Sequence, residues 1–468
     1  MPNTERIWEL VEDHKDDLIA LSDQIFDSPE IAYQEHQSAD QHAAALEAAG
    51  FTVNRGAAGI PTALVAEAGE EGPVVAILGE FDALPGLSQV AGLAEPLPVE
   101  AGQPGHGCGH NLLGAASVLA AIAVRDWLAE KGKAARIRYY GCPAEEGGAA
   151  KTFMVRAGLF DDVDAAISWH PATFTAVNPA NSLANARINY RFTGRASHAA
   201  SAPDLGRSAL DACELMNVGI NYLREHMPDG SRVHYAYLNI GDGTENVVPA
   251  HAGVRQMIRS RNLAGLRSLM ERVCKIAEGA ALMTETKVEE RIYTATSNLL
   301  GNRALEEAMH ANLERLGPPV FDASDRDFAK AIRATLSDED ISVSFRRIGL
   351  ETDPDLPLCE FVAPLGSRGS SGVGSTDVGD VSWAVPTVQA RIATCAVGTP
   401  FHSWQLTAQG KAPAAHKGLI YAAKVMAGTA ADLIEKPELL DKARALHTDQ
   451  LSTTPYVCPI PPDVSPPI

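Results

Sequence analysis

Five short segments of the chain concentrate side chains that can bind metal ions. They are GEFDALPG (79–86), HGCGHN (106–111), CPAEEGG (142–148), SWHP (168–171) and PFHSW (400–404). A thiolate and an imidazole two residues apart, as in Cys108 and His110, suit Zn²⁺, and imidazole with carboxylate also admits Mn²⁺ or Co²⁺. Taken alone, this pair is equally consistent with a buried cysteine beside a loop histidine.

Glu145 and Glu146 are adjacent acids directly after an expected strand. Because neighbouring side chains of an extended segment point in different directions, one carboxylate can bind metal while the other acts as a general base. The plainer alternative is a solvated pair of charges at a helix N-terminus, where anions are favoured.

Three further residues are ambiguous when considered singly. His170 follows the apolar stretch AAISW, and His402 lies between Phe401 and Ser403. A lone histidine in either context is more often structural than a ligand. Asp82 follows the apolar strand VVAILG and can either orient a ligand from behind the metal site or cap a turn.

The elements expected around these segments indicate an α/β fold. Apolar strands at 62–68, 73–79, 136–141 and 165–169 alternate with helices near 112–129 and 149–157, which predicts a mostly parallel sheet. Four of the five segments fall at strand ends, and in open α/β sheets active sites gather beyond the carboxyl ends of strands. The spacing therefore predicts that segments far apart in sequence converge.

The pattern changes after about residue 183. Residues 184–298 follow the order strand–helix–strand–strand–helix–strand, which is typical of a ferredoxin-like α+β domain. We therefore expect two domains: a discontinuous catalytic domain, 1–183 and 299–468, and an inserted domain, 184–298. The last 16 residues contain six prolines, so they are expected to form an extended tail.

Composition narrows the class of protein. The 468 residues include 39 Lys+Arg and 59 Asp+Glu, a net charge of −20, which disfavours a nucleic-acid partner. No run of about 18 apolar residues and no signal-peptide pattern is present, so neither a membrane span nor secretion is expected. Seven cysteines without a CxxC pair favour a reducing compartment, and cytoplasm is the expected location.

Together, the motifs HGCGHNLLG, PAEEGGAAK, GRASHAASAP and GSTDVGD resemble a family of metal-dependent metallopeptidases. The family includes aminoacylases and glutamate carboxypeptidase, and the resemblance, over about residues 5–430, is greatest to the p-aminobenzoyl-glutamate hydrolase subunits of its amidohydrolase branch. It implies a catalytic α/β domain with an inserted lid and dimerisation domain. It also implies two divalent metal ions, Zn²⁺ or Mn²⁺ with Co²⁺ as a further candidate. The implied ligands are Cys108, His110, Glu146, His170 and His402, with Glu145 as general base and Asp82 as supporting carboxylate.

Three positions of the inserted domain also match the family. His198 resembles the lid histidine that completes the active site, often across a dimer, and Asn246 matches a substrate-contacting position. Arg259 would hold the carboxylate of the substrate's amino-acid part, because its planar fork pairs two oxygens. Without the resemblance, a strand histidine, a turn asparagine and a surface ion pair are the expected roles.

The chain departs from the branch pattern at two positions. Asn111 stands where much of the branch has Asp, as in the p-aminobenzoyl-glutamate hydrolase-like members, and Glu80 stands where other branches have a metal-binding His. The glycine-rich run 366–379 has no nucleotide-binding spacing, and no HExxH or GxSxG motif occurs. Within that run, Ser375 and Asp377 are candidate pocket residues, with loop structure as the plainer expectation.

The sequence thus predicts a metal-dependent amidohydrolase acting on N-acyl or N-aroyl amino acids, with a p-aminobenzoyl-glutamate-type substrate as first choice. Two alternatives stay open: a dipeptidase acting on β-alanyl or basic dipeptides, and a non-catalytic partner subunit of a paralogous hydrolase. The expected partners are a small-molecule substrate and a second protein chain that pairs through the lid, in a homodimer or a heterodimer with a paralogue.

Overall fold

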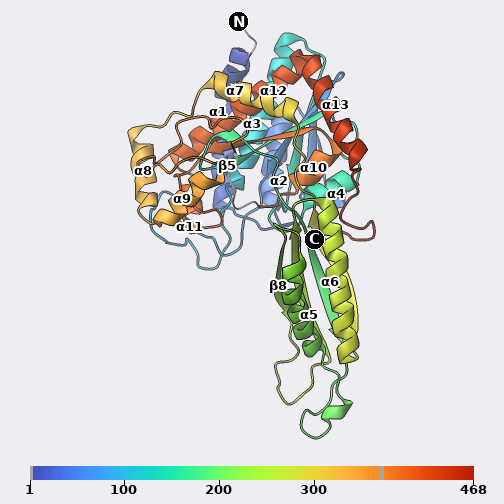
Figure 1. Ribbon diagram of the computed structural model, residues 1–468. Helices are drawn as coiled ribbons and strands as arrows, with labels where there is room; N and C mark the ends of the chain where they lie inside the picture. Colours follow the sequence, from blue (N-terminus) through green and yellow to red (C-terminus); the bar gives the residue numbers. More distant parts are fainter. Residues whose placement is uncertain (1–3, 368–373) are drawn as a thin grey trace.

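The structure of the chain is a computed structural model that describes residues 4–367 and 374–468. Residues 368–373, part of the glycine-rich run, lie outside these ranges. Figure 1 shows a layered α/β part and an elongated arm that projects from it. We call residues 184–296, which hold the four strands of the second sheet and the helices between them, the arm.

The α/β part is built on a seven-stranded sheet. In spatial order its strands are β1 (Thr52–Arg55), β2 (Leu64–Ala68), β4 (Arg136–Cys142), β3 (Val74–Glu80), β5 (Ala165–Ala172), β11 (Thr387–Ala393) and β6 (Ala176–Val177). The strands that carry the candidate ligands, β3, β4 and β5, are neighbours at its centre. Their carboxyl ends therefore open on one edge of the sheet.

This sheet is mixed, and the expectation of a mostly parallel sheet was wrong. The β4–β3, β3–β5 and β5–β11 pairs are parallel, whereas β1–β2, β2–β4 and β11–β6 are antiparallel. Parallel neighbours need a long crossover, usually a helix. The short link between β1 and β2 contains no such helix, so these two strands pair in the antiparallel sense. Strand β6 does not pair with β5 but lies antiparallel to β11.

Both faces of the central strands are covered. Every residue of β3 is buried: Val75 and Ile77 pack into one apolar cluster, and Ala76 and Leu78 into another on the opposite face. The first face is covered by three mutually packed helices, α1 (Thr4–Asp27), α3 (His110–Lys131) and α12 (Pro413–Glu435). Helices α4 (Ala150–Arg156) and α10 (Val378–Ala384) pack on the second face. Because strand side chains alternate between faces, burial on both sides requires this uninterrupted apolar run.

The arm is a four-stranded antiparallel sheet with two long helices. Its strands lie in the order β10 (Lys287–Thr296), β7 (Ala184–Thr193), β9 (His251–Ser260), β8 (Arg232–Asn239), with helices α5 (Ala209–Leu223) and α6 (Leu263–Thr284) packed together. Along the chain the elements follow the expected strand–helix–strand–strand–helix–strand order. Strand β8 lies at the edge of this sheet, so one side of its backbone has no neighbouring strand among the described residues.

The remaining helices surround the α/β part. They are α2 (His36–Ala48), α7 (Arg303–Leu316), α8 (Ala323–Arg333), α9 (Asp338–Arg347), α11 (Trp404–Gln409) and α13 (Pro437–Thr453), with the 3₁₀ turn η1 (Ala57–Gly59). Two further 3₁₀ turns, η2 (Pro203–Leu205) and η3 (Arg224–His226), lie in the arm. Helix α11 ends at Gln409, and α12 begins shortly after it with Pro413. Helices α8 and α9 were not expected from the sequence.

The proline-rich tail is extended, as expected, and it is docked. The guanidinium group of Arg156 donates hydrogen bonds to the carbonyl oxygens of Pro461 at 2.6 Å and Val464 at 2.8 Å. The hydroxyl of Tyr456 donates to Asp380 at 2.9 Å. The tail is therefore anchored beside α4 and α10 by hydrogen bonds to its backbone, in addition to the burial of Ile460.

Helix α3 is, among the described residues, long and apolar enough to cross a membrane by length and composition alone. However, 83% of its most apolar 18-residue stretch is buried inside the protein. Core helices of this kind pass the same test, and α3 packs between α1, α12 and the sheet.

Candidate metal centre

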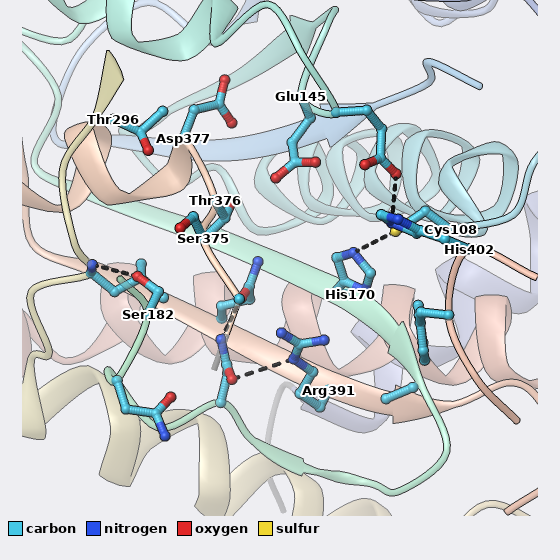
Figure 2. A pocket seen from close by; sticks show the side chains of 18 of the residues that line it. Cys108, Glu145, His170, Ser182, Thr296, Ser375, Thr376, Asp377, Arg391 and His402 are labelled. Atoms are coloured by element: carbon cyan, nitrogen blue, oxygen red, sulfur yellow. Dashed lines mark hydrogen bonds and ion pairs between the residues drawn. The ribbon is translucent and has the colours of Figure 1, made fainter. Parts of the chain in front are cut away.

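A cavity of about 640 Å³ lies where the arm meets the α/β part. Its lining includes Cys108, Glu145 and His170 from the α/β part and Arg187 and Arg259 from the arm. Figure 2 shows Cys108, Glu145, His170 and His402 turned toward one another at one end, with Ser375 and Asp377 across from them. The cavity thus brings together residues that are hundreds of positions apart.

The candidate metal ligands converge at that end of the cavity. Three overlapping groups have ligand atoms within 4.8 Å of one another: Cys108, His110 and His170; Cys108, Glu146 and His402; Glu80, His110 and Glu145. All five sequence-predicted ligands and the predicted base are therefore clustered. The reason is topological, since Glu80 ends β3, Glu145 and Glu146 follow β4, and His170 lies near the end of β5.

The candidate ligand atoms approach one another closely, and two of them are left without a hydrogen bond. Cys108 Sγ lies 3.4 Å from His170 Nε2, and His402 Nε2 lies 3.3 Å from Glu146 Oε1. The buried atoms His110 Nε2 and Glu146 Oε1 have no hydrogen-bond partner among the described residues. Buried polar atoms are costly unless paired or bound to metal, and sulfur, nitrogen and carboxylate oxygen together suit divalent metal ions. The residues present therefore fit a divalent metal site.

Asp82 orients two of these groups. Its Oδ1 accepts a hydrogen bond from His110 Nδ1 at 2.9 Å, and its Oδ2 accepts one from the backbone N–H of Glu146 at 2.9 Å. The first bond leaves Nε2 of His110 as the ring nitrogen that faces the cluster. His170 is held in the same way, because its Nδ1 donates to the carbonyl oxygen of Pro171 at 2.8 Å. Such outer contacts fix the tautomer and the direction of a histidine ligand.

The loop that carries Glu145 and Glu146 has an unusual backbone. Ala144 and Ala149 have φ angles of 57° and 56°, a region that costs a non-glycine residue roughly 1–2 kcal/mol. Two contacts from the segment before α2 hold this loop: Glu35 accepts from the N–H of Ala144 at 2.8 Å, and Tyr33 donates to the carbonyl of Gly148 at 2.7 Å. Tyr33 and Glu35 were missed by sequence reasoning, because nothing near them marks a contact with residues 144–148.

A second buried network adjoins the cluster and was also missed. Lys151 Nζ lies 2.7 Å from Glu80 Oε1 and 2.6 Å from Asp377 Oδ1, and all three side chains are almost fully buried. Glu80, which replaces a histidine of other branches, is thus paired with a cation while its other oxygen lies 3.4 Å from His110 Nε2. The lysine within PAEEGGAAK was the available signal, since a charged residue in an apolar helix start needs a partner.

Burial and charge shift the titration of the central residues. Burial raises the pKa of Glu145 well above its usual value, and the nearby carboxylates of Glu80 and Glu146 raise it further. Burial lowers the pKa of His170 well below its usual value, and the charge of Arg391 acts in the same direction. A carboxylate of raised pKa is suited to accept a proton, and a neutral imidazole is suited to bind metal.

Of the three predicted arm residues, one lines the cavity and two do not. Arg259 lines the cavity and donates to the hydroxyl of Ser375 at 2.6 Å, and Ser375 and Asp377 line it as well. His198 and Asn246 do not line it; they are exposed in arm loops, with Asn246 Nδ2 3.4 Å from His198 Nε2. Within a single chain, therefore, only Arg259 of the three is brought to the site.

The family model that matches this sequence is peptidase family M20/M25/M40, over residues 76–352. The chain is 48% identical to one of the p-aminobenzoyl-glutamate hydrolase subunits of Escherichia coli K12, over 95% of both chains. It is 29% identical to the Xaa-Arg dipeptidase of Mus musculus, over 96% of this chain and 94% of the other. A Bacillus subtilis protein described as a dinuclear metal-binding peptidase shares the fold, with a TM-score of 0.58 at 17% identity, covering 91% of this chain and 99% of the other. The chain belongs to peptidase family M20/M25/M40 and is a hydrolase of amide bonds.

Proposed function

We propose that the protein is a metal-dependent amidohydrolase that cleaves N-acyl or N-aroyl derivatives of acidic amino acids, of the p-aminobenzoyl-glutamate type. One observation carries this proposal: the five candidate ligands surround Glu145 at one end of a cavity whose remaining wall carries arginines. The identity of 48% to a p-aminobenzoyl-glutamate hydrolase subunit supports the same substrate class.

In this proposal Cys108, His110, Glu146, His170 and His402 hold two divalent metal ions, for which Zn²⁺ and Mn²⁺ are the first candidates. When bound, such ions supply Lewis-acid chemistry and lower the pKa of water. Glu145 accepts the proton of the attacking water and later delivers it to the leaving nitrogen. Asp82 keeps His110 and the Glu146 backbone in place through its two hydrogen bonds.

Arg259 binds a carboxylate of the substrate in this proposal. It reaches the cavity from β9 of the arm, and its guanidinium group makes no ion pair with any carboxylate that the structure describes. A planar guanidinium binds a carboxylate through two parallel hydrogen bonds. This contact, away from the scissile bond, would align the amide with Glu145.

The dipeptidase alternative is weakened by the charge of the cavity wall. Arg187, Arg259, Arg347 and Arg391 all line it, and a basic amino-acid side chain would be repelled there. This argument leaves dipeptides with an acidic residue as possible substrates. The non-catalytic alternative is weakened because Glu145 and every candidate ligand are present and clustered.

We assign residues 1–183 and 299–468 to the catalytic domain and 184–298 to a ferredoxin-like lid and dimerisation domain. The strand order β10-β7-β9-β8 supports the assignment. The edge strand β8 exposes Tyr235 and Leu238, which suits pairing with a second protein chain. In such a dimer His198 would complete the site of the other protomer; a heterodimer is equally compatible, and the E. coli relative is itself described as a subunit.

The cytoplasm remains our proposed location. All seven cysteines are free thiols, and five of them are buried. Free buried thiols are typical of proteins that stay in a reducing compartment.

The proposed function is tested by hydrolysis assays on the purified protein alone, with added Mn²⁺ or Zn²⁺ and with chelator controls. The panel comprises p-aminobenzoyl-glutamate, hippurate, N-acetyl amino acids and β-alanyl dipeptides. Chelator-sensitive cleavage of the aroyl-glutamate above the other substrates supports the proposal. Preference for a β-alanyl dipeptide would replace it with the dipeptidase alternative, and no cleavage by metal-loaded protein would favour an obligate partner.

A further inference from the structure

Four arginines line the cavity, and none of them is paired with an acid among the described residues. Arg187 and Arg259 come from β7 and β9 of the arm, Arg347 from the end of α9, and Arg391 from β11. No ion pair within 4.0 Å joins any of these four to a carboxylate in the described part of the chain. In a chain of net charge −20, unpaired cations gathered in one cavity indicate that the cavity receives anions.

Two largely buried cations elsewhere in the molecule are matched by acids, whereas the buried Arg333 donates only to the carbonyl oxygens of Pro354 and Leu356. Lys151 is paired with Glu80 and Asp377, and Arg138 is paired with Glu67 and Asp162. The comparison matters because a buried charge without a partner is strongly destabilising. Like Arg333, the cavity arginines lack an acid partner, but unlike Arg333 they line a cavity, where a ligand can supply that partner.

Arg391 is the most informative of the four. Its strand runs parallel to β5, where it is the register partner of His170, so both side chains leave the sheet beside each other. Adjacent strands are about 4.8 Å apart, which places the base of Arg391 next to the metal cluster. Figure 2 shows its guanidinium group on the same side of β11 as His170.

The hydrogen bonds around Arg391 leave its outer edge available. Its Nε donates to Asn178 Oδ1 at 3.3 Å, and the Nδ2 of Asn178 donates to Gln389 Oε1 at 2.5 Å. Asn178 is thus held in the orientation that presents its oxygen to Arg391. The two terminal nitrogens of Arg391 have no hydrogen-bond partner among the described residues, and their N–H groups match the two oxygens of one carboxylate.

Arg391 and Arg259 approach the cavity from different sheets. Arg259 belongs to the arm and is tied to Ser375, whereas Arg391 belongs to the seven-stranded sheet and is tied to Asn178. An amino acid with a second carboxylate in its side chain offers one carboxylate to each. A neutral side chain would leave Arg391 facing an uncharged group.

We propose that Arg391 is the specificity-determining residue that binds the side-chain carboxylate of the amino acid released, and thereby selects acidic amino acids over their neutral amides. The inference rests on the proposed amidohydrolase function and adds to it the residue that distinguishes the substrates. Arg259 then binds the other carboxylate.

The test compares kcat/KM for p-aminobenzoyl-L-glutamate and p-aminobenzoyl-L-glutamine, which differ only in that carboxylate. We expect the wild-type protein to favour the glutamate substrate by about 10-fold to 100-fold, because losing a charged hydrogen-bond partner has an effect of that order. In Arg391→Gln the ratio should fall to about threefold or less, mainly through a higher KM for the glutamate substrate. Arg391→Lys, which keeps the charge without the fork, should give an intermediate ratio.

Arg346→Gln is the control, because Arg346 is an exposed arginine of α9 that does not line the cavity. Its ratio should stay within about threefold of the wild-type value. Each variant is checked for folding by thermal melting and for bound metal; if Arg391→Gln does not fold, the ratio of Arg391→Lys decides. An equal loss on both substrates in a folded variant, or a wild-type protein without preference, would overturn the proposal.

A binding measurement separates this inference from the proposed function. Calorimetric titration of the metal-loaded protein with L-glutamate and L-glutamine needs no turnover. Tighter binding of glutamate in the wild type, lost in Arg391→Gln, would support the subsite even if neither aroyl substrate were cleaved, an outcome that would overturn the proposed function alone. Equal affinities for the two ligands would overturn the subsite.

Discussion

Two walls of the cavity differ in charge and in how their supporting groups are paired. The metal wall holds the candidate ligands and Glu145, and the arginine wall holds Arg187, Arg259, Arg347 and Arg391. On the metal wall, His110 and the Glu146 backbone are both fixed by Asp82, and Lys151 joins Glu80 to Asp377. On the arginine wall, Arg259 and Arg391 contact only neutral groups, and their charges have no partner in the described chain. The fold therefore fixes the groups behind the metal wall through its own contacts, whereas it leaves the charges of Arg259 and Arg391 available for a ligand.

This contrast also explains why whole-chain charge is a poor guide to the substrate. The net charge of −20 is spread over the molecule, whereas the walls of the cavity differ in sign over a short distance. Local charge determines which ligand enters, because interactions between charges are stronger where water is excluded. An acidic protein can therefore hold a site for an acidic ligand.

The largest expected effect comes from disabling the metal wall chemically while leaving its ligands in place. Glu145→Gln removes the group that accepts and returns the proton, so kcat should fall by about 10²-fold to 10⁴-fold. Bound metal, measured by elemental analysis, should be unchanged, because a glutamine side chain is nearly isosteric with a glutamate. Full activity in this variant would remove Glu145 as the base.

A smaller effect, on metal affinity, is expected from a substitution at Asp82, which orients two of the candidate ligands. Asp82→Asn weakens the two hydrogen bonds that Asp82 accepts, and loss of such an outer partner typically lowers metal affinity by about 10-fold to 100-fold. Metal retention after dialysis against graded chelator measures the change. The exposed carboxylate variant Asp40→Asn is the control and should retain metal like the wild type. Equal retention by both variants would mean that His110 and Glu146 are held by other contacts.

A substitution in the arginine wall should weaken substrate binding and leave metal binding unchanged. Arg259→Ala removes a charged carboxylate partner, so KM for substrates with a free carboxylate should rise about tenfold or more, with bound metal unchanged. Steady-state kinetics compare p-aminobenzoyl-glutamate with its α-methyl ester, which lacks the carboxylate that Arg259 binds. The KM of the ester should therefore change less in the variant. An unchanged KM would place the carboxylate anchor elsewhere in the cavity.

A further expected effect is on stability rather than on activity and concerns Glu35, which supports the catalytic loop from behind the metal wall. Burial and the charge of Asp82 raise the pKa of Glu35 from 4.5 to about 8. Between these values the folded protein binds a proton that the unfolded chain has released. The free energy of unfolding should therefore fall as the pH rises from about 4.5 to 8, by up to about 1.4 kcal/mol per pH unit.

Glu35→Gln cannot titrate, so this part of the pH dependence should disappear in the variant. Urea unfolding at several pH values between about 5 and 8 measures it, and the stability of the variant relative to the wild type should improve as the pH rises. Parallel pH profiles for the two proteins would show that the Glu35 carboxyl is not protonated in the folded state.

Much of the metal wall was predictable, and the arginine wall was largely not. The predicted ligands stand in short motifs at strand ends, and parallel neighbouring strands bring their carboxyl ends together. Arg187 and Arg391 stand in strands without a motif, although a charged residue inside the buried strand β11 was a signal. The antiparallel pairs of the larger sheet were missed because alternation of strands and helices does not determine the direction of every strand. Strands β1 and β2 are joined by a short link, whereas the β2–β4 and β11–β6 pairs join strands far apart in sequence.

The sequence by itself determined which atoms are available for chemistry and roughly where each element begins, since motif residues and apolar periodicity are local properties. The tertiary structure alone decided which charges meet. It paired Lys151 with two acids, brought Tyr33 and Glu35 to the loop of Glu145, placed His198 outside the cavity of its own chain and left Arg391 facing into it. Contacts between distant segments depend on how sheets and helices pack, and that packing is a property of the whole chain.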